Sequence, residues 1–265
     1  MLKVTNVRKT FNKGTINEKK ALNGINLQLN EGDFVTVIGG NGAGKSTMLN
    51  MIAGVYPIDS GKIEIDDINI SRDAEFKRAK YIGRVFQDPM MGTAAGMEIQ
   101  ENLALALRRG KKRGLGWGIK SNEKEIYQNA LAKLSLGLED RMSSKVGLLS
   151  GGQRQALTLL MATLKKPKLL LLDEHTAALD PKTAAKVLEL TNEMVTRDNL
   201  TTLMVTHNMK DAIAIGNRLI MMNEGKIIYD VSGEDKKRLT VDDLLKKFSE
   251  ASGDEFANDR MMLSK

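Results

Sequence analysis

The chain has 265 residues, enough to bury a sizeable core as one large domain or two modest ones. It has no cysteine, which excludes disulfides and thiolate metal ligands and leaves oxygen or histidine to hold any cation. The formal net charge of +7 favours acidic partners such as nucleotide phosphates, an anionic lipid surface or nucleic acid, but the 4% aromatic content leaves few stacking platforms for single-stranded nucleic acid.

The first 36 residues indicate antiparallel strands that stay in the cytoplasm. Polar and apolar residues alternate from the start, and no apolar core is followed by a cleavage site of small residues. Residues 30–33, Asn-Glu-Gly-Asp, are typical of a turn. The longest apolar stretches fall far short of the roughly 18 residues that a membrane span requires. We therefore expect an N-terminal antiparallel β subdomain and no span.

A glycine-rich loop then follows a short apolar strand at residues 34–38 and precedes a helix at 46–52. The loop matches G-x-x-x-x-G-K-[ST], in which backbone N–H groups approach phosphates, Lys45 supplies positive charge and Ser46 can bind Mg²⁺. The alternative is a glycine turn beside a surface lysine. The residues expected to bind phosphate are Gly39, Gly40, Asn41, Gly42, Ala43, Gly44, Lys45, Ser46 and Thr47.

A second strand at residues 81–86 ends at Gln87, whose amide could contact Mg²⁺ or an attacking water. Beyond it, helical periodicity at 99–107 and 126–136 predicts an inserted helical subdomain, interrupted by a glycine-rich basic segment at 108–118. The basic run 108–113 is either a solvated charge run or a contact for lipid headgroups or an acidic loop.

The segment Leu-Ser-Gly-Gly-Gln at residues 149–153 predicts a second helix start that could attract an anion. Ser150 can cap the helix, while Gly151 and Gly152 remove side chains before Gln153, so that an anion can approach the positive end of the helix. The alternative is an ordinary capped helix. Because one nucleotide rarely needs two such sites from one chain, the pair of sites indicates a site shared between two copies.

Two later apolar runs also end in polar residues. The run at 168–172 leads directly to Asp173, suited to Mg²⁺, and to Glu174, which could polarise an attacking water or accept its proton. After a helix at 183–197, the run at 201–206 ends at His207. Open α/β sheets bind ligands at the carboxyl ends of their strands, so we expect these residues to converge with Gln87. The alternatives are an acidic helix cap and a structural histidine.

The buried runs without alternation indicate a parallel sheet covered on both faces, and the alternating N-terminal strands make the sheet mixed. Residues 232–265 are mostly charged, with an amphipathic piece at 239–248, and predict a C-terminal helix followed by a frayed tail.

Taken in this order, the motifs resemble those of the ATP-binding cassette (ABC) ATPase family over about residues 1–230. Residues 39–47 resemble the Walker A loop, Gln87 the Q-loop and 149–153 the signature. Residues 169–174 resemble the Walker B strand, 178–180, which end in Asp180, the D-loop, and His207 the switch histidine. Phe11 falls where the family places an aromatic residue against adenine, although a phenylalanine that ends a strand can equally be core.

The resemblance implies an α/β, P-loop NTPase core of the ABC type, with a mixed and largely parallel sheet. We expect a nucleotide-binding core at 1–89 and 158–231, the helical insert with the signature at 90–157, and the C-terminal helix and tail at 232–265. Met90, Met91 and Met97 fall where the family meets a short helix of its membrane subunit, although core packing explains them equally well.

The resemblance further implies the ATP-hydrolysing subunit of a bacterial importer that binds ATP and Mg²⁺ between two copies packed head to tail. The implied partners are a second copy, an integral-membrane permease and an extracellular substrate-binding protein, with no nucleic acid, at the cytoplasmic face of the membrane. The implied roles are metal binding for Ser46, Gln87 and Asp173, catalysis for Glu174, His207 and Gln87, and ATP contacts for Phe11, residues 39–47, Ser150, Gly151, Gly152, Gln153 and Asp180.

Two points stay open in the sequence. A non-transport switch is possible, either of the cell-division type on a membrane partner or a DNA-repair or translation ATPase, although no long coiled coil and no second motif set is present. His175 stands where most importer cassettes have proline, a pattern similar to a subgroup of which some members are thought to carry amino acids. His175 either adjusts the charge near the γ-phosphate or is a harmless replacement.

Overall fold

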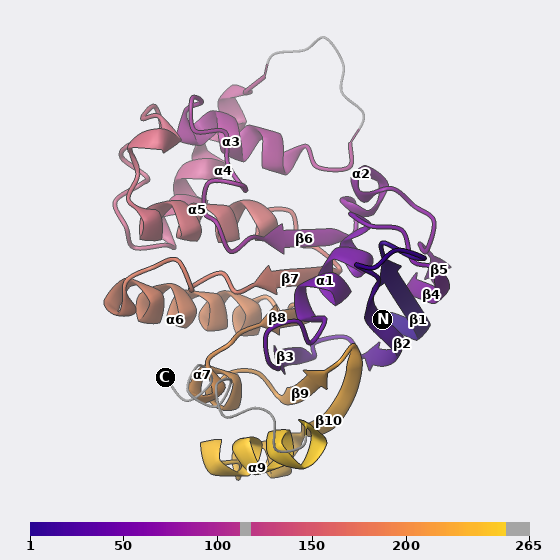
Figure 1. Cartoon of the computed structure of the whole chain (residues 1–265). Helices are drawn as coiled ribbons and strands as arrows, with labels where there is room; N and C mark the ends of the chain where they lie inside the picture. Colours follow the sequence, from indigo (N-terminus) through magenta and orange to yellow (C-terminus); the bar gives the residue numbers. More distant parts are fainter. Residues whose placement is uncertain (112–117, 253–265) are drawn as a thin grey trace. The chain divides into compact units, whose positions relative to one another are not determined.

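The computed structural model describes residues 1–111 and 118–252, and the chain divides into two compact units (Figure 1). The first unit comprises Met1–Arg78 together with the segment that begins at Leu200, and the second comprises Ala79–Asn199. The expected tail from residue 253 onwards and the last two residues of the basic run, 112 and 113, lie outside the described residues.

The N-terminal strands of the first unit form an antiparallel sheet of their own, in the order β2-β1-β4-β5. Strand β1 (Leu2–Phe11) pairs with β2 (Lys19–Leu29) on one side and with β4 (Ser60–Ile65) on the other, and β5 (Ile68–Asn69) continues from β4. Buried and exposed residues alternate at the start of β1, as expected for a sheet with one covered face. The predicted antiparallel β subdomain is confirmed.

A second group of strands in this unit is largely parallel. Strand β3 (Phe34–Ile38) is buried throughout and pairs in parallel with β8 (Thr202–Val205) and β9 (Arg218–Asn223). Strand β10 (Lys226–Ser232) is antiparallel to β9. The sheet is therefore mixed, as predicted, but the antiparallel member is β10. The turn at 30–33 leads from the antiparallel sheet to β3. Strand β3 is buried on both faces and lies between the buried strands β8 and β9.

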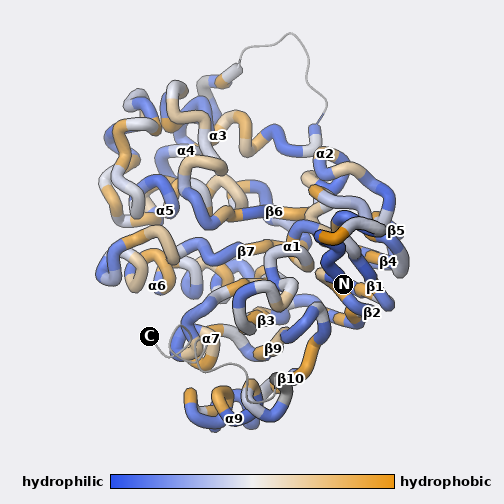
Figure 2. The backbone as a smooth tube through the Cα atoms, in the orientation of Figure 1, coloured by the Kyte–Doolittle hydropathy of each residue, from blue (hydrophilic) through white to orange (hydrophobic). Residues whose placement is uncertain are grey.

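The helices of the first unit are α1 (Lys45–Ala53), α2 (Glu75–Arg78), α7 (Met209–Ala214), α8 (Gly233–Lys237) and α9 (Val241–Ser252). Apolar and polar residues alternate along α9 (Figure 2). Its apolar face packs against α7 and the sheet, in a cluster formed by Ile38, Met209, Ala212, Leu219, Met221, Leu244 and Phe248.

In the second unit, two buried parallel strands carry polar residues at their carboxyl ends. Strand β6 (Ile82–Val85) pairs with β7 (Leu169–Asp173), with Val85 opposite Leu172. All four leucines of β7 are fully buried. Both strands were predicted from their apolar runs, and they begin and end within a residue of the predicted limits.

The helices of this unit are α3 (Ile99–Leu107), α4 (Ser121–Ala132), α5 (Gly151–Thr163) and α6 (Pro181–Arg197), with a 3₁₀ turn at Val146–Leu148 before α5. Helix α3 matches its prediction. Helix α4 begins before the predicted residue 126 because the Glu123 carboxylate accepts a hydrogen bond from the Lys120 N–H at 3.0 Å. The predicted insert 90–157 lies within this unit together with β6, β7 and α6.

Within residues 1–111 and 118–252, no helix combines the length and the apolar character that a membrane crossing requires.

Candidate functional site

The glycine loop of the first unit connects the end of β3 to the start of α1. Gly44 has φ of 100°, and a Cβ at this position would lie 2.6 Å from the Ala21 carbonyl oxygen, so both its conformation and its surroundings require glycine. The Lys45 side chain is buried, and its Nζ donates to the carbonyl oxygens of Gly39 and Gly40 at 2.7 and 3.2 Å. The ammonium group is thus held directly at the loop, where phosphate oxygens would find it.

The turn between β9 and β10 supports the loop from behind. The Gly225 N–H donates to the Ala43 carbonyl oxygen at 3.0 Å, and the Gly225 carbonyl oxygen accepts from the Asn23 N–H at 2.8 Å. Gly225 was not singled out from the sequence. The backbone of the loop is therefore fixed between α1 and a turn that comes some 180 residues later in the chain.

His207 lies at the same sheet edge as the glycine loop. The Thr206 N–H donates to the Val37 carbonyl oxygen at 3.1 Å, which aligns the carboxyl end of β8 with that of β3. His207 follows directly and is exposed, and Asn208 caps α7 by accepting from two backbone N–H groups. Burial raises the pKa of Asp211, and the neighbouring His207 opposes that shift.

Phe11 ends β1 and is half-buried, outside the buried core. The Phe11 ring meets the ring of Tyr56 edge to face, with 5.4 Å between the centroids. The Lys9 ammonium lies 5.5 Å from the centroid of the Phe11 ring. Tyr56 is exposed and was not singled out from the sequence. A partly exposed aromatic pair is available to a flat apolar ligand such as a base, and the adenine contact stays a prediction.

In the second unit, Gln87, Asp173 and Glu174 follow the adjacent ends of β6 and β7. Gln87 is exposed, while the two carboxylates are half-buried. One oxygen of Asp173 lies 3.8 Å from the Arg84 guanidinium on the neighbouring strand. Glu174 adopts a left-handed backbone conformation with φ of 44°, which is uncommon for a residue with a side chain. The strand-end positions of these three residues agree with the sequence analysis.

The imidazole of His175 points into the interior against α6. It is 2% exposed, and its Nε2 lies 3.0 Å from the hydroxyl of Thr191. Burial lowers the pKa of His175 to about 4, so the ring is neutral at physiological pH. Of the two alternatives for His175, adjustment of the charge near a phosphate does not fit this position, because an apolar environment disfavours the imidazolium.

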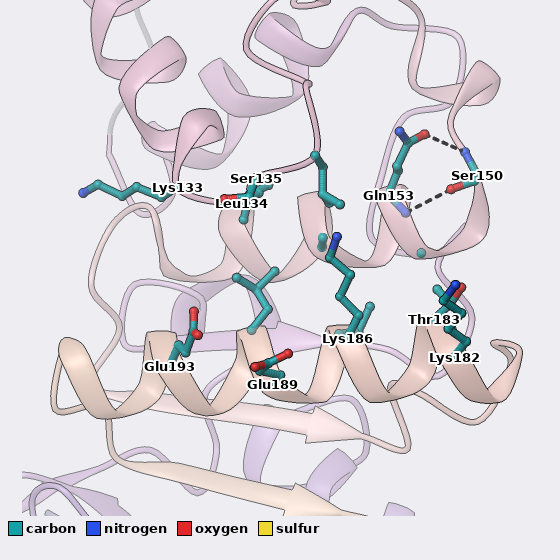
Figure 3. A pocket seen from close by; sticks show the side chains of 15 residues that line it. Lys133, Leu134, Ser135, Ser150, Gln153, Lys182, Thr183, Lys186, Glu189 and Glu193 are labelled. Atoms are coloured by element: carbon teal, nitrogen blue, oxygen red, sulfur yellow. Dashed lines mark hydrogen bonds between the residues drawn. The ribbon is translucent and has the colours of Figure 1, made fainter.

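Ser150 caps helix α5, as predicted. Its Oγ accepts from the Gln153 N–H at 3.3 Å, and the Gln153 side-chain oxygen accepts from the Ser150 N–H at 3.2 Å, the two dashed lines in Figure 3. This reciprocal capping box uses Gln153 at its third position, and the first turn of α5 contains no acidic residue. Asp180 similarly caps α6 by accepting from the Thr183 N–H at 3.1 Å, and this bonding to Thr183 lowers the pKa of its carboxyl group.

The glycines after Ser150 also have a packing role. A Cβ on Gly152 would collide with the methyl group of Thr183, and one on Gly151 would lie 3.3 Å from Leu179. The start of α5 can therefore approach the start of α6 only because these residues lack side chains. A groove of about 380 Å³ opens beside this contact, with Ser150 and Gln153 on one wall and Lys186 on the other (Figure 3).

Two polar residues of α5 were not recognised as site residues from the sequence. The Gln155 side-chain NH₂ donates to the carbonyl oxygen of Phe86 at 3.1 Å and so connects α5 to the residue before Gln87. The Arg154 guanidinium donates to three carbonyl oxygens of the segment before Ser150. Both are long polar side chains buried on a helix whose other buried residues, apart from Thr158, are apolar, and that contrast is the signal by which they could have been found.

The start of the basic run is structural rather than solvated. The Arg108 Nη2 donates to both carboxylate oxygens of Glu123, at 2.8 and 3.0 Å. Arg109 donates to the carbonyl oxygens of Ala162 and Lys165 at the end of α5, and burial lowers its pKa. The interpretation of these two arginines as a solvated charge run is wrong, because their partners lie in α4 and at the end of α5.

The three methionines that follow Gln87 differ in exposure. Met90 and Met91 are exposed, and Met97 is half-buried.

The structure brings the glycine loop and His207 together in the first unit, and Gln87, Asp173 and Glu174 together in the second. In the described residues no cluster of three acidic or histidine side chains could enclose a metal by itself. Mg²⁺ is commonly bound by one or two protein oxygens together with phosphate oxygens and water. The hydroxyl, amide and carboxylate oxygens of Ser46, Gln87 and Asp173 are of the type that fits this mode, and the buried Lys45 fits a phosphate.

Comparison with known proteins gives consistent matches. A family model described as ABC transporter matches residues 22–177. The chain is 45% identical to the tyrosine transport ATP-binding protein of Clostridioides difficile over 95% of this chain and 100% of that protein. It is 33% identical to the methionine import ATP-binding protein MetN of Bartonella henselae over 87% of this chain and 64% of MetN. The solved dimeric cassette MJ0796, bound to ADP and Pi in a post-hydrolysis state, has a TM-score of 0.73 at 31% identity and covers 88% of this chain and 98% of that chain.

Proposed function

The chain belongs to the ABC transporter family and is an ATPase of that family, and from this premise we propose that it drives a separate membrane permease by binding and hydrolysing MgATP between two copies. The observation that supports the proposal most directly is the order of the polar strand ends and helix starts along the chain. Each family motif is present once and in family order.

Within each chain, we assign the phosphates to the glycine loop. The N–H groups of residues 39–47 and the Lys45 ammonium would balance the charge of the β- and γ-phosphates. Glu174 would orient the attacking water and accept its proton as the water oxygen bonds to the γ-phosphorus and the bond to the β-phosphate oxygen breaks, which releases ADP and phosphate. His207 would contact the γ-phosphate. Phe11 would contact adenine.

Ser46, Gln87 and Asp173 would hold Mg²⁺, which when bound neutralises charge on the phosphates that accumulates during the reaction.

The second copy would complete the site. Ser150, Gly151, Gly152 and Gln153 form a helix start with its N–H groups and positive dipole end available to an anion. We propose that this segment closes over the γ-phosphate bound by the partner copy, and that Asp180 lies at the same interface. The dimeric structure of the similar cassette MJ0796 supports a pair of copies as the working unit.

The proposed partners are a permease on the membrane and an extracellular substrate-binding protein. Exposed Met90 and Met91 next to Gln87 offer an adaptable apolar surface to a permease helix. The relative named for methionine import supports import, and the relative named for tyrosine transport supports an amino acid as the cargo. The chain would then lie at the cytoplasmic face of the membrane. Co-purification of a multispanning permease would support the proposal, whereas co-purification of ribosomes or DNA would reject it.

The variant Glu174→Gln tests the catalytic assignment. It keeps the shape of the side chain but cannot accept a proton, so we expect hydrolysis to be abolished while ATP binding is preserved and the dimer accumulates. Steady-state hydrolysis, equilibrium ATP binding and size-exclusion chromatography measure the three effects. Hydrolysis at the parental rate would refute the role of Glu174.

The variant Ser150→Arg tests the shared site, with Ser150→Thr as the control that retains a capping hydroxyl. We expect the arginine variant to bind ATP as a monomer almost normally but to lose both dimer formation and hydrolysis. If the monomer loses ATP binding instead, the segment serves its own chain.

A further inference from the structure

The turn that carries Glu174 is attached to α6 at two points. At one end Asp180 caps the helix, and Pro181 is its first residue. At the other end His175 reaches the hydroxyl of Thr191 at 3.0 Å. Ten residues separate Pro181 and Thr191, so the two attachments lie about 15 Å apart along the helix axis. Two separated attachments fix the orientation of a segment, whereas a single one allows it to pivot.

The direction of the His175 hydrogen bond follows from the partners of Thr191. The Thr191 Oγ1 also lies 2.8 Å from the Val187 carbonyl oxygen, which can only accept. A threonine hydroxyl has one hydrogen, and it is used by Val187. With the Thr191 hydroxyl donating to Val187, the matching tautomer of His175 carries its proton on Nε2 and donates a hydrogen bond to Thr191. The result is a chain of two directed hydrogen bonds that ends in the backbone of α6.

The environment makes this contact a firm one. His175 is 2% exposed and Thr191 is fully buried, so water does not replace either partner. Helix α6 is a well-anchored base, with Val187, Met194 and Val195 also buried. Within the turn, the Ala177 N–H donates to the Glu174 carbonyl oxygen at 2.9 Å and the Leu179 N–H donates to the Thr176 carbonyl oxygen at 3.2 Å.

Glu174 needs such support because of its backbone conformation. Its φ of 44° is one that a residue with a side chain adopts only where the surroundings hold it. The residue directly after it is the buried His175. We propose that His175, through Thr191, is a positioning residue that holds the Glu174 carboxylate in its working orientation. The inference rests on the proposed role of Glu174 in hydrolysis.

The test removes the acceptor without changing the shape of the side chain. Thr191→Val lacks the hydroxyl but keeps the branched side chain, and Thr191→Ser keeps the hydroxyl as the matched control. We expect Thr191→Val to lower kcat for ATP hydrolysis by between about 10-fold and 100-fold, the usual cost of a misplaced catalytic group. The dissociation constant for ATP should stay within about twofold of the parental value, and Thr191→Ser should retain most of the parental kcat.

Two further variants distinguish positioning from a loss of folded protein. His175→Phe keeps a buried ring without a donor and should lower kcat to a similar extent, and combining it with Thr191→Val should add little, because both remove the same bond. Rates are divided by the concentration of molecules that bind ATP, so a smaller folded fraction does not count as a lower kcat.

The outcomes separate this inference from the proposed function. If Glu174→Gln abolishes hydrolysis while Thr191→Val and His175→Phe hydrolyse ATP at the parental rate, His175 has no positioning role and the inference is overturned. Additive effects of the two substitutions would also overturn it. If Glu174→Gln itself hydrolyses ATP normally, the proposed function fails first.

Discussion

Replacing Arg78 by methionine should destabilise the first unit, because the Arg78 guanidinium closes the C-terminal end of α1. Its guanidinium is 2% exposed and donates to the carbonyl oxygens of Met51 and Ile52, in the last turn of α1, at 2.8 and 3.0 Å. It also donates to the carbonyl oxygens of Asp73 and Ser71 at 2.8 and 3.1 Å. Burial lowers the pKa of Arg78, yet four acceptors face it.

The expected magnitude follows from these four hydrogen bonds. Each hydrogen bond to a charged group contributes about 1.5 to 3 kcal/mol, but the contributions do not add in full, because the buried guanidinium has lost its hydration and the freed carbonyls partly regain water. Breaking a buried charged network costs about 3 to 5 kcal/mol. Methionine fills most of the space but donates to none of the acceptors. We therefore expect Arg78→Met to lower the free energy of unfolding by about 3 to 5 kcal/mol.

The assay is chemical unfolding followed by circular dichroism, with hydrogen exchange of the α1 amides as a local readout. Arg72→Met is the matched control, because Arg72 is exposed in the turn before α2 and an exposed substitution changes stability by no more than about 0.5 kcal/mol. Arg78→Lys keeps the charge without the fork and should fall in between. The reasoning is refuted if Arg78→Met costs less than about 1 kcal/mol, or no more than Arg72→Met.

Two other predictions test contacts around the motifs. Gly152→Ala should lower the free energy of unfolding, measured with urea, by about 1 to 3 kcal/mol because the new methyl group overpacks the contact with Thr183. Adding Thr183→Ser removes the opposing methyl group and should restore most of the stability, so equal stability of the single and double variants would contradict the contact. Burial lowers the pKa of Lys236 to about 8 from 10.5, so between these values the unfolded chain binds more protons and stability rises with pH. The parental protein should then gain up to about 3 kcal/mol relative to Lys236→Met as the pH rises through this window, and a pH-independent difference would show that Lys236 does not titrate there.

The strand-end positions could be predicted because they depend on local patterns. An apolar run that ends in a polar residue identifies the end of a buried strand without knowledge of any partner, and this places Asp173 and His207 correctly at the carboxyl ends of β7 and β8. The cap of Ser150 on α5 is local in the same sense, since its partner is three residues away. The binding and catalytic roles of these residues stay predictions.

The side-chain partners could not be predicted, because they come from distant segments. Arg109 bonds to residues more than fifty positions later, so composition alone makes it part of a charge run. His175 is directed into the interior by Thr191, on a helix whose packing no local pattern specifies. The limits of the second unit could not be predicted for the same reason. The unit Ala79–Asn199 includes β6, β7 and α6 through their packing, whereas helical periodicity in the sequence indicates only the helices.

Arg78, Arg109 and Lys236 share one physical role. The helices α1, α5 and α7 each follow a motif at their N-terminus, namely the glycine loop, the Ser150 segment and His207. Each has a cation at its C-terminal end: the buried Arg78 on α1, the half-buried Arg109 on α5, and the buried Lys236 on α7. The Lys236 Nζ donates to the carbonyl oxygens of residues 213, 215 and 216 at 2.8, 2.6 and 3.1 Å. A cation at this end satisfies the last carbonyls and opposes the negative end of the dipole. The N-terminal ends stay unoccupied by acidic side chains on α1 and α5, so the positive ends of these two helices remain available to phosphate, while their opposite ends are fixed to the body of their own unit.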